Sequence, residues 1–158
     1  MIAVEQASRL AAPAGEVWDW ALTPAGINYE LGPWLRMTVP PGLRGRNVAD
    51  VRPGERPGRS WLLLSGVLPV DYDDLGIVEL EPGRRFLERS TMATMRLWQH
   101  ERVIEPAGEG ACGITDRLSF ELRRPLAAMP GSARLARAIV AFVFRHRHRR
   151  LRARFGES

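Results

Sequence analysis

Three ionisable residues, Glu88, His100 and Asp116, lie in three consecutive segments whose residue types are typical of β-strands. If their side chains face one side of a sheet, the group could bind a ligand hydroxyl or carbonyl, or His100 and Asp116 could act as acid and base. A structural role is the favoured alternative, in which His100 and Asp116 satisfy each other. In a related version, Arg102, Arg117 or an arginine of the C-terminal helix neutralises the carboxylates.

The orientation of Asp116 follows from the apolar residues that share its parity, because alternate residues of a strand face the same side of a sheet. These residues are Cys112, Ile114, Leu118, Phe120 and Leu122. Asp116 is therefore expected to point toward the core. A hairpin centred near Gly108 would place His100 opposite Asp116 and Trp98 opposite Leu118, although a slip in register would undo this pairing.

An acidic segment, Asp71–Asp74, follows Pro69. It predicts a solvated turn near a cavity mouth in preference to a cation site, because it lacks the regular oxygen and glycine spacing of a calcium loop. His146 and His148 are two residues apart on a predicted helix, so they face different directions and do not predict a shared metal site. We expect neither a metal nor a cofactor. No motif resembles a nucleophile elbow, so hydrolase chemistry has no support.

The longest predicted helix covers Ser132–Phe155, with Ser132 as its N-cap and Gly156 as its stop. Its first half is apolar over a broad arc, which predicts burial on several sides: Leu135, Ala136, Ile139, Val140, Phe142, Val143 and Phe144. Its second half, Arg145–Arg154, is basic. A narrower apolar stripe joins the two halves and predicts one buried face along the whole helix: Val140, Phe144, Leu151 and Phe155.

The remaining segments predict an antiparallel sheet with short helices after its first strand. The expected strands are Ile2–Leu10, Trp34–Val39, Ser60–Leu68, Leu75–Leu80, Arg85–Thr91, Met95–Glu105 and Ala111–Leu122. The expected short helices are Glu16–Leu22 and a second that runs to about Leu31. Residues 1–158 are therefore predicted to form one α+β domain. The proline- and glycine-rich stretch Pro40–Arg59 predicts a lid, or a loop with a small element of its own.

This order of elements resembles the helix-grip fold of the START/SRPBCC superfamily, which includes polyketide cyclase/dehydrase-like proteins, and its motifs look like an uncharacterised bacterial subgroup. The segments that carry the resemblance are Ala12–Pro13 with Val17–Trp18, Gly66–Asp71, Phe86–Arg89, Trp98–Arg102, Thr115–Arg117 and Phe144–His148. The resemblance implies a curved antiparallel sheet around the C-terminal helix, with a cavity for an apolar ligand between them. Fold alone does not define a reaction.

The candidate ligand-binding residues combine the polar group with apolar side chains expected on the cavity wall. They are Trp18, Glu88, Leu97, Trp98, His100, Asp116, Phe120, Val140 and Phe144. Two function classes use this cavity: binding of a hydrophobic small molecule such as a lipid, polyketide or isoprenoid, and a cyclase or dehydratase in which the Pro40–Arg59 loop excludes water.

A third class, an interaction module, would use the basic helix end. The chain has a net charge of +5, and six arginines fall within Arg145–Arg154, so the rest of the chain carries about −1. A solvated face is the favoured interpretation of this patch, followed by weak contact with an anionic membrane surface and then by nonspecific nucleic-acid contact. Specific nucleic-acid binding is not supported, because the basicity is local. The single cysteine, Cys112, and the lack of a signal peptide or long apolar run predict a cytoplasmic protein. The sequence leaves the oligomeric state open.

Overall fold

The computed structural model describes residues 1–158 as an antiparallel sheet with all its α-helices on one face. The strands are β1 (Ile2–Leu10), β2 (Leu35–Met37), β3 (Gly58–Leu64), β4 (Leu68–Leu75), β5 (Ile77–Glu81), β6 (Arg85–Met92), β7 (Met95–Pro106) and β8 (Cys112–Leu122). The helices are α1 (Ala14–Ala21), α2 (Pro24–Leu31) and α3 (Ser132–Phe155), with short 3₁₀ turns at Pro41–Leu43, Val48–Asp50 and Leu126–Ala128.

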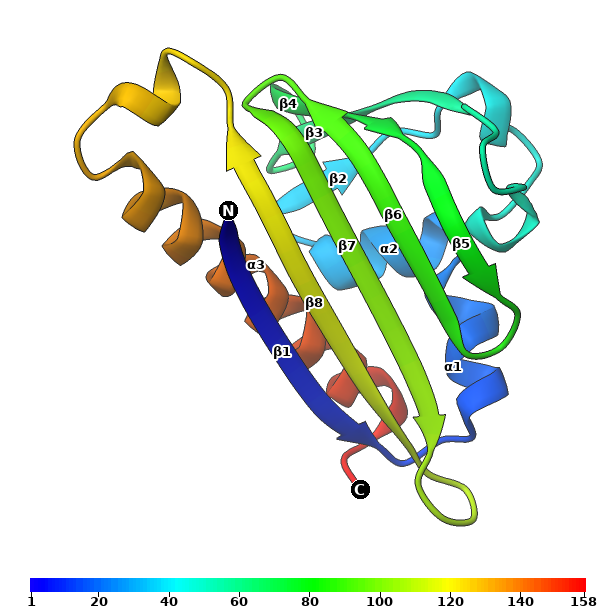
Figure 1. Ribbon diagram of the computed structural model, residues 1–158. Coiled ribbons are helices and arrows are strands. Elements are labelled where there is room, and N and C mark those ends of the chain that lie inside the picture. The colour runs from blue at the N-terminus through cyan, green and yellow to red at the C-terminus, as the bar shows by residue number, and fades with distance from the viewer.

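The strand order β1-β8-β7-β6-β4-β3-β2, with β5 paired to β6, gives a curved sheet that wraps α3 (Figure 1). The predicted α+β helix-grip architecture is confirmed. The far end of α3 is tied to the end of β1, because Ala11 N–H donates to the carbonyl of Gly156 at 3.0 Å. No helix of the structure is both long and apolar enough to cross a membrane.

Strands β3 and β4 differ from the prediction. Ser60–Leu68 is not one strand, because Ser65 and Gly66 both adopt positive φ angles and turn the chain back between β3 and β4. Strand β4 then runs through Asp71–Asp74, so the predicted solvated acidic turn is wrong. Asp73 is only 4% exposed, since alternation along β4 turns its side chain inward.

The Pro40–Arg59 stretch contains two 3₁₀ turns, as the alternative of a loop with its own elements predicted. Leu43, Val48 and Val51 of this loop are buried in the main hydrophobic cluster. Arg46 adds a salt bridge to Glu55 at 2.6 Å inside the loop.

The β7–β8 hairpin keeps the predicted facing of its residues but has a different register. His100 pairs with Leu118, Trp98 with Phe120, and Arg102 with Asp116. The predicted pairings of His100 with Asp116 and of Trp98 with Leu118 are therefore wrong by two residues. The loop is centred on Glu109 rather than Gly108, because glycines on both sides of it adopt positive φ angles. A two-residue shift preserves parity, so His100 and Asp116 still point inward.

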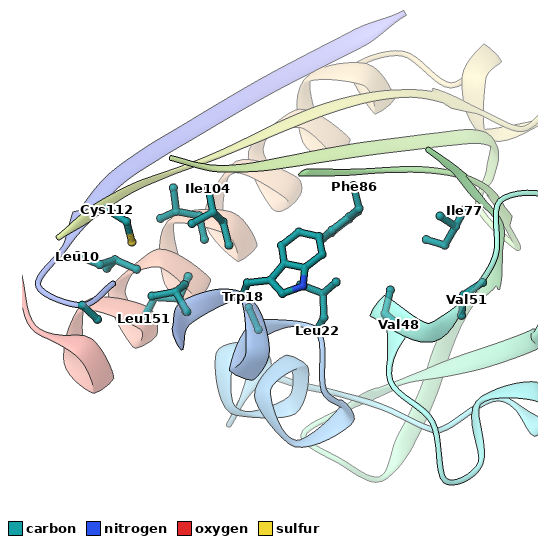
Figure 2. Packing of buried hydrophobic residues seen from close by; sticks show 14 of the residues in the cluster. Leu10, Trp18, Leu22, Val48, Val51, Ile77, Phe86, Ile104, Cys112 and Leu151 are labelled. Carbon is teal, nitrogen blue, oxygen red and sulfur yellow. The ribbon is translucent and has the colours of Figure 1, made fainter. Parts of the chain in front are cut away.

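The buried apolar residues form two clusters separated along the sheet. The larger one, which we call the closed core, has 16 residues, among them Trp18, Phe86, Ile104 and Leu151 (Figure 2). The smaller one has seven: Met92, Met95, Trp98, Leu118, Phe120, Val140 and Phe144. Helix α3 contributes to both, so it spans them along the inner face of the sheet.

The first half of α3 is more exposed than predicted. Leu135, Ile139 and Phe142 are 63%, 53% and 44% exposed, although they belong to the predicted buried arc. The predicted narrow stripe is correct for Val140, Phe144 and Leu151, which are all buried. The N-cap is Gly131 rather than Ser132, which is the first helical residue, whereas Gly156 ends the helix as predicted.

A matched pair of substitutions on α3 tests this division. Leu151→Ala should lower the free energy of unfolding by about 2–5 kcal/mol, because it leaves a cavity in a fully buried site. Leu135→Ala on the same helix should change it by less than about 0.5 kcal/mol. Urea unfolding of both variants measures the difference, and equal losses would contradict the assignment of Leu135 to the exposed side.

Candidate functional site

Between the two apolar clusters lies a buried layer of ionisable residues centred on Arg102 of β7. Its guanidinium donates from Nε to Oδ1 of Asp116 at 2.7 Å and from Nη2 to Oδ2 at 2.8 Å, a bidentate pair. The same guanidinium donates to both carboxylate oxygens of Glu30, on α2, at 2.8 and 3.0 Å. Arg147 of α3 donates from Nε to Glu30 at 3.0 Å. Two carboxylates and two guanidiniums therefore balance inside the protein; we call this group with His100 and His148 the polar layer.

Asp116 also accepts hydrogen bonds from two histidines. Nε2 of His100 and Nε2 of His148 each lie 2.7 Å from one of its oxygens, so Asp116 accepts four hydrogen bonds in total. Behind His148, Arg152 donates to the Ser8 hydroxyl oxygen at 2.7 Å, which leaves that hydroxyl free to donate to His148 Nδ1 at 2.8 Å. The network thus joins β1, β7, β8, α2 and α3.

The charges in this layer stabilise one another. Burial opposes ionisation of Asp116, but Arg102 and His100 outweigh it and hold the pKa of Asp116 well below its usual range. Burial likewise opposes the charge on Glu30, while Arg102 and Arg147 lower its pKa. Burial lowers the pKa of His100 despite the opposing attraction of Asp116. Asp116 is therefore ionised, and its hydrogen-bond acceptor positions are filled.

A cavity of about 680 Å³ lies between the sheet and the first half of α3, and it extends along the polar layer as far as closed-core residues such as Leu22, Ile77 and Phe86. Of its 41 lining residues, 26 are hydrophobic. Five of the lining apolar side chains are between 43% and 63% exposed, so the cavity opens to the surface beside them: Val39, Val70, Met129, Leu135 and Ile139. Leu135 and Ile139, on the exposed side of α3, thus form part of the wall and rim of the cavity.

The cavity wall contains five of the predicted ligand-binding residues: Glu88, Trp98, His100, Val140 and Phe144. Phe144 packs against His100, with ring centroids 5.1 Å apart, and against Trp98 at 6.3 Å. Glu88 accepts a hydrogen bond from the Trp98 indole at 3.2 Å. These side chains, from β6, β7 and α3, line the same cavity.

The other four predicted residues lie off the cavity wall. Trp18 belongs to the closed core, where its ring packs against Phe86 (Figure 2). Phe120 is fully buried beside Trp98, and Asp116 lies in the polar layer. Leu97 precedes the inward-facing Trp98, so alternation along β7 points it to the other face of the sheet, and a bulge between Met95 and Leu97 allows Met95 to line the cavity as well.

Sequence reasoning missed Glu30, Asp73 and His148, and it anticipated Arg147 only as an unspecified arginine of the C-terminal helix. His148 follows Phe144 by four residues and precedes Leu151 by three, so its place on the buried stripe could have been read from the helical period. Arg102 shares the parity of His100 along β7, so its inward orientation could also have been predicted from the sequence. No comparable signal marks Glu30, which lies on a short helix of weak periodicity.

The arginine-rich end of α3 is only partly a solvated face. Arg147 is buried against Glu30, and Arg152 bonds Ser8. The guanidinium of Arg150 lies 4.1 Å from the ring centre of Tyr29, and that of Arg154 lies 3.6 Å from the ring centre of Trp20. These four arginines fix α3 to the rest of the fold by ion pairing, hydrogen bonding and cation–π contact.

The fold is a helix-grip fold similar to that of a START superfamily protein. Solved structures of similar fold include the protein CV1439 from Chromobacterium violaceum (14% identity, 100% of each chain covered, TM-score 0.73) and a START superfamily protein from Mycobacterium smegmatis (13% identity, 97% of this chain and 96% of that one, TM-score 0.67). The similarity to DynU16, a putative protein in the dynemicin biosynthetic locus, covers 99% of this chain and 49% of the DynU16 chain (16% identity, TM-score 0.58).

The particular family follows from the sequence itself. Residues 8–155 match the model of the family described as Domain of unknown function (DUF8410), and the chain belongs to that family. A search of the curated proteins finds no match.

Replacement of Asp116 tests the polar layer. Asp116→Asn should lower the free energy of unfolding at pH 7 by about 3–5 kcal/mol, because it removes the charge that Arg102 faces in a buried site. Glu5→Gln, which alters an exposed pair with Arg117 on the other face, should have little effect. Denaturant unfolding of both variants checks this, and a loss no larger than that of Glu5→Gln would contradict the assigned role.

The same variant predicts a pH dependence. Because the pKa of Asp116 is lowered in the folded state, its contribution to stability is present above its unfolded pKa of about 3.9 and is lost as the pH falls below that value. The stability gap between wild type and Asp116→Asn should therefore shrink as the pH is lowered from about 5 toward 2. A gap that stays constant across this range would count against an ionised Asp116.

Proposed function

We propose that this protein binds a hydrophobic small molecule, such as a lipid, polyketide or isoprenoid, in the cavity between the sheet and α3. The observation that carries the proposal is a cavity of about 680 Å³ whose lining is mostly apolar and which opens to the surface. Ligand sites in proteins typically have volumes of about 300–1,000 Å³ and apolar walls with a few polar groups.

The affinity would come from burial of apolar ligand surface, which contributes about 25 cal/mol per Å² before the costs of binding. The aromatic side chains of Trp98 and Phe144 offer wide apolar contact on the inner wall. Glu88 and His100 would orient the polar part of the ligand. Similarity in fold to a START superfamily protein and to a protein from a biosynthetic locus supports the same class of function.

A cyclase or dehydratase that uses His100 and Asp116 is the alternative. His100 lines the cavity, which supports contact between its imidazole and a ligand. Asp116, however, already accepts hydrogen bonds from His100, His148 and Arg102, so no acceptor position remains to take a proton from a substrate. The binding proposal is preferred for this reason.

An interaction module built on the basic helix end has less support. Four of its arginines contact groups within the fold, and Arg145 and Arg149 remain as exposed cations without an ion-pair partner in the structure. Two exposed arginines give weak attraction to an anionic membrane surface, about 1 kcal/mol each close to it.

The same substitution at two positions of α3 tests the binding proposal. Ala136 lines the cavity, whereas Ala138 lies two residues further along and is exposed away from it. Ala136→Trp should weaken binding of a neutral apolar dye such as Nile red at least tenfold, because the indole occupies ligand space. Ala138→Trp should leave the affinity unchanged, as measured by fluorescence titration.

Two outcomes would contradict the proposal: wild-type protein that binds no neutral apolar probe, or Ala136→Trp protein that binds the dye as tightly as Ala138→Trp. Circular dichroism of both variants establishes that they are folded.

A further inference from the structure

Two of the four buried carboxyl groups have no cationic partner. Glu30 and Asp116 are paired with arginines in the polar layer, but Asp73 and Glu88 form no ion pair with any arginine of the chain. The only positively ionisable group near them is His100, whose Nδ1 lies 3.8 Å from Glu88 Oε2. In a protein with 23 basic residues, this absence makes the pair distinctive.

Both unpaired carboxyls lie on the cavity wall, on the neighbouring strands β4 and β6. Asp73 is 4% exposed, and its Oδ1 is buried with no hydrogen-bond partner. Glu88 is 6% exposed, with the Trp98 indole as its hydrogen-bond donor. Asp73 also shares side-chain hydrogen bonds with Glu88 and Ser90, but its Oδ1 lacks a donor, and a buried carboxyl oxygen without one is costly.

The surroundings decide which kind of group fits. Arg102 and Arg147 also line the cavity, but Glu30 and Asp116 already neutralise them. On the other side, Asp71 and Asp74 of β4 add negative charge beside Asp73. An anionic ligand head would therefore be repelled at this wall, and a hydroxyl would satisfy Asp73 Oδ1 without balancing the charge.

We infer that the cavity selects an apolar molecule whose polar end is a protonated amine, held by Asp73 and Glu88. This inference rests on the proposed function and specifies its ligand class. The ammonium group can donate up to three hydrogen bonds, enough for both carboxyls, while its hydrocarbon part extends along Trp98 and Phe144 toward α3. The ligand supplies to Asp73 and Glu88 the positive charge that arginines of the chain supply to Glu30 and Asp116.

Ionisation of Asp73 and Glu88 is unfavourable while no cation is bound beside them, which supports this assignment. Burial and the charge of Asp73 raise the pKa of Glu88 well above its usual range, and burial also raises the pKa of Asp73. Both carboxyls therefore hold a proton more tightly than a free carboxyl does, and a bound ammonium ion would favour its release. Amine binding should release protons and tighten as the pH rises through the titration of the pair.

Three probes of equal chain length test the inference: dodecylamine, 1-dodecanol and dodecanoic acid, each used below its aggregation concentration to displace Nile red at pH 7. The amine should bind about 10- to 100-fold more tightly than the alcohol, the range expected for a charge-assisted hydrogen bond. The acid should bind more weakly than the alcohol. The double variant Asp73→Asn/Glu88→Gln should abolish the preference for the amine and retain the affinity for the alcohol.

Asp74→Asn is the matched control, because it removes a carboxylate from the next residue of β4, which does not line the cavity. It should keep the amine preference. Amine affinity no greater than that of the alcohol, or an amine preference that survives in the double variant, would overturn this inference and leave the proposed function standing. Failure of all three probes and of Nile red to bind would overturn both.

The stability of the free protein gives a readout that needs no ligand. Carboxyls whose pKa is raised on folding reduce stability as the pH rises above their unfolded values of about 4. The double variant, and Asp73→Asn alone, should therefore unfold at a higher temperature than wild type at pH 7, with the difference closing toward pH 4. Dodecylamine should raise the midpoint temperature of thermal unfolding of the wild type and leave that of the double variant unchanged. A variant that is less stable than wild type at pH 7 would contradict an unpartnered acidic pair.

Discussion

The bidentate pair between Arg102 and Asp116 is the interaction on which the arrangement of the molecule depends. It lies at the centre of the buried surface between sheet and helix, and both of its members are essentially inaccessible to solvent. Buried charges of this kind are stable only when every hydrogen-bonding position is matched. Glu30 of α2, Arg147 and His148 of α3, and His100 of β7 supply those matches, so the relative position of α2, α3, β7 and β8 is specified by a few polar atoms.

This layer lies between the two apolar clusters. On one side, Trp18, Ile104, Leu151 and their neighbours form the closed core, which gives the fold its stability (Figure 2). The cavity runs along the layer and borders both clusters, from Trp98 and Phe144 of the smaller one to Ile77 and Phe86 of the closed core. His100, Arg102 and Arg147 of the layer form part of its wall, so the residues that fix the position of α3 also shape the cavity.

Much of the fold could be predicted from the sequence, because the signals were local. The length of α3, the alternation of β7 and β8, and the inward facing of His100 and Asp116 follow from spacing alone. The register of the hairpin could not be predicted, since two glycines flank Glu109 and permit more than one loop centre. The exposure of Leu135 and Ile139 was missed because apolar residues of a helix face a cavity and a filled core with the same periodicity. Glu30 and Asp73 carry no sequence signal of burial; only the tertiary structure brings them to the interior.

The proposed ligand would contact Trp98 on the cavity wall, whereas Trp18 lies off that wall, so the two tryptophans report binding separately. The Trp98 indole N–H donates to Glu88 on the cavity wall, whereas Trp18 is packed in the closed core. The most direct measurement is a two-dimensional ¹⁵N NMR titration of the indole resonances with a neutral apolar probe, assigned with Trp98→Phe and Trp18→Phe variants. A saturable shift of the Trp98 resonance with little change at Trp18 is the predicted result. Shifts centred on Trp18, or none at Trp98 while the probe binds, would contradict a ligand cavity between the sheet and α3.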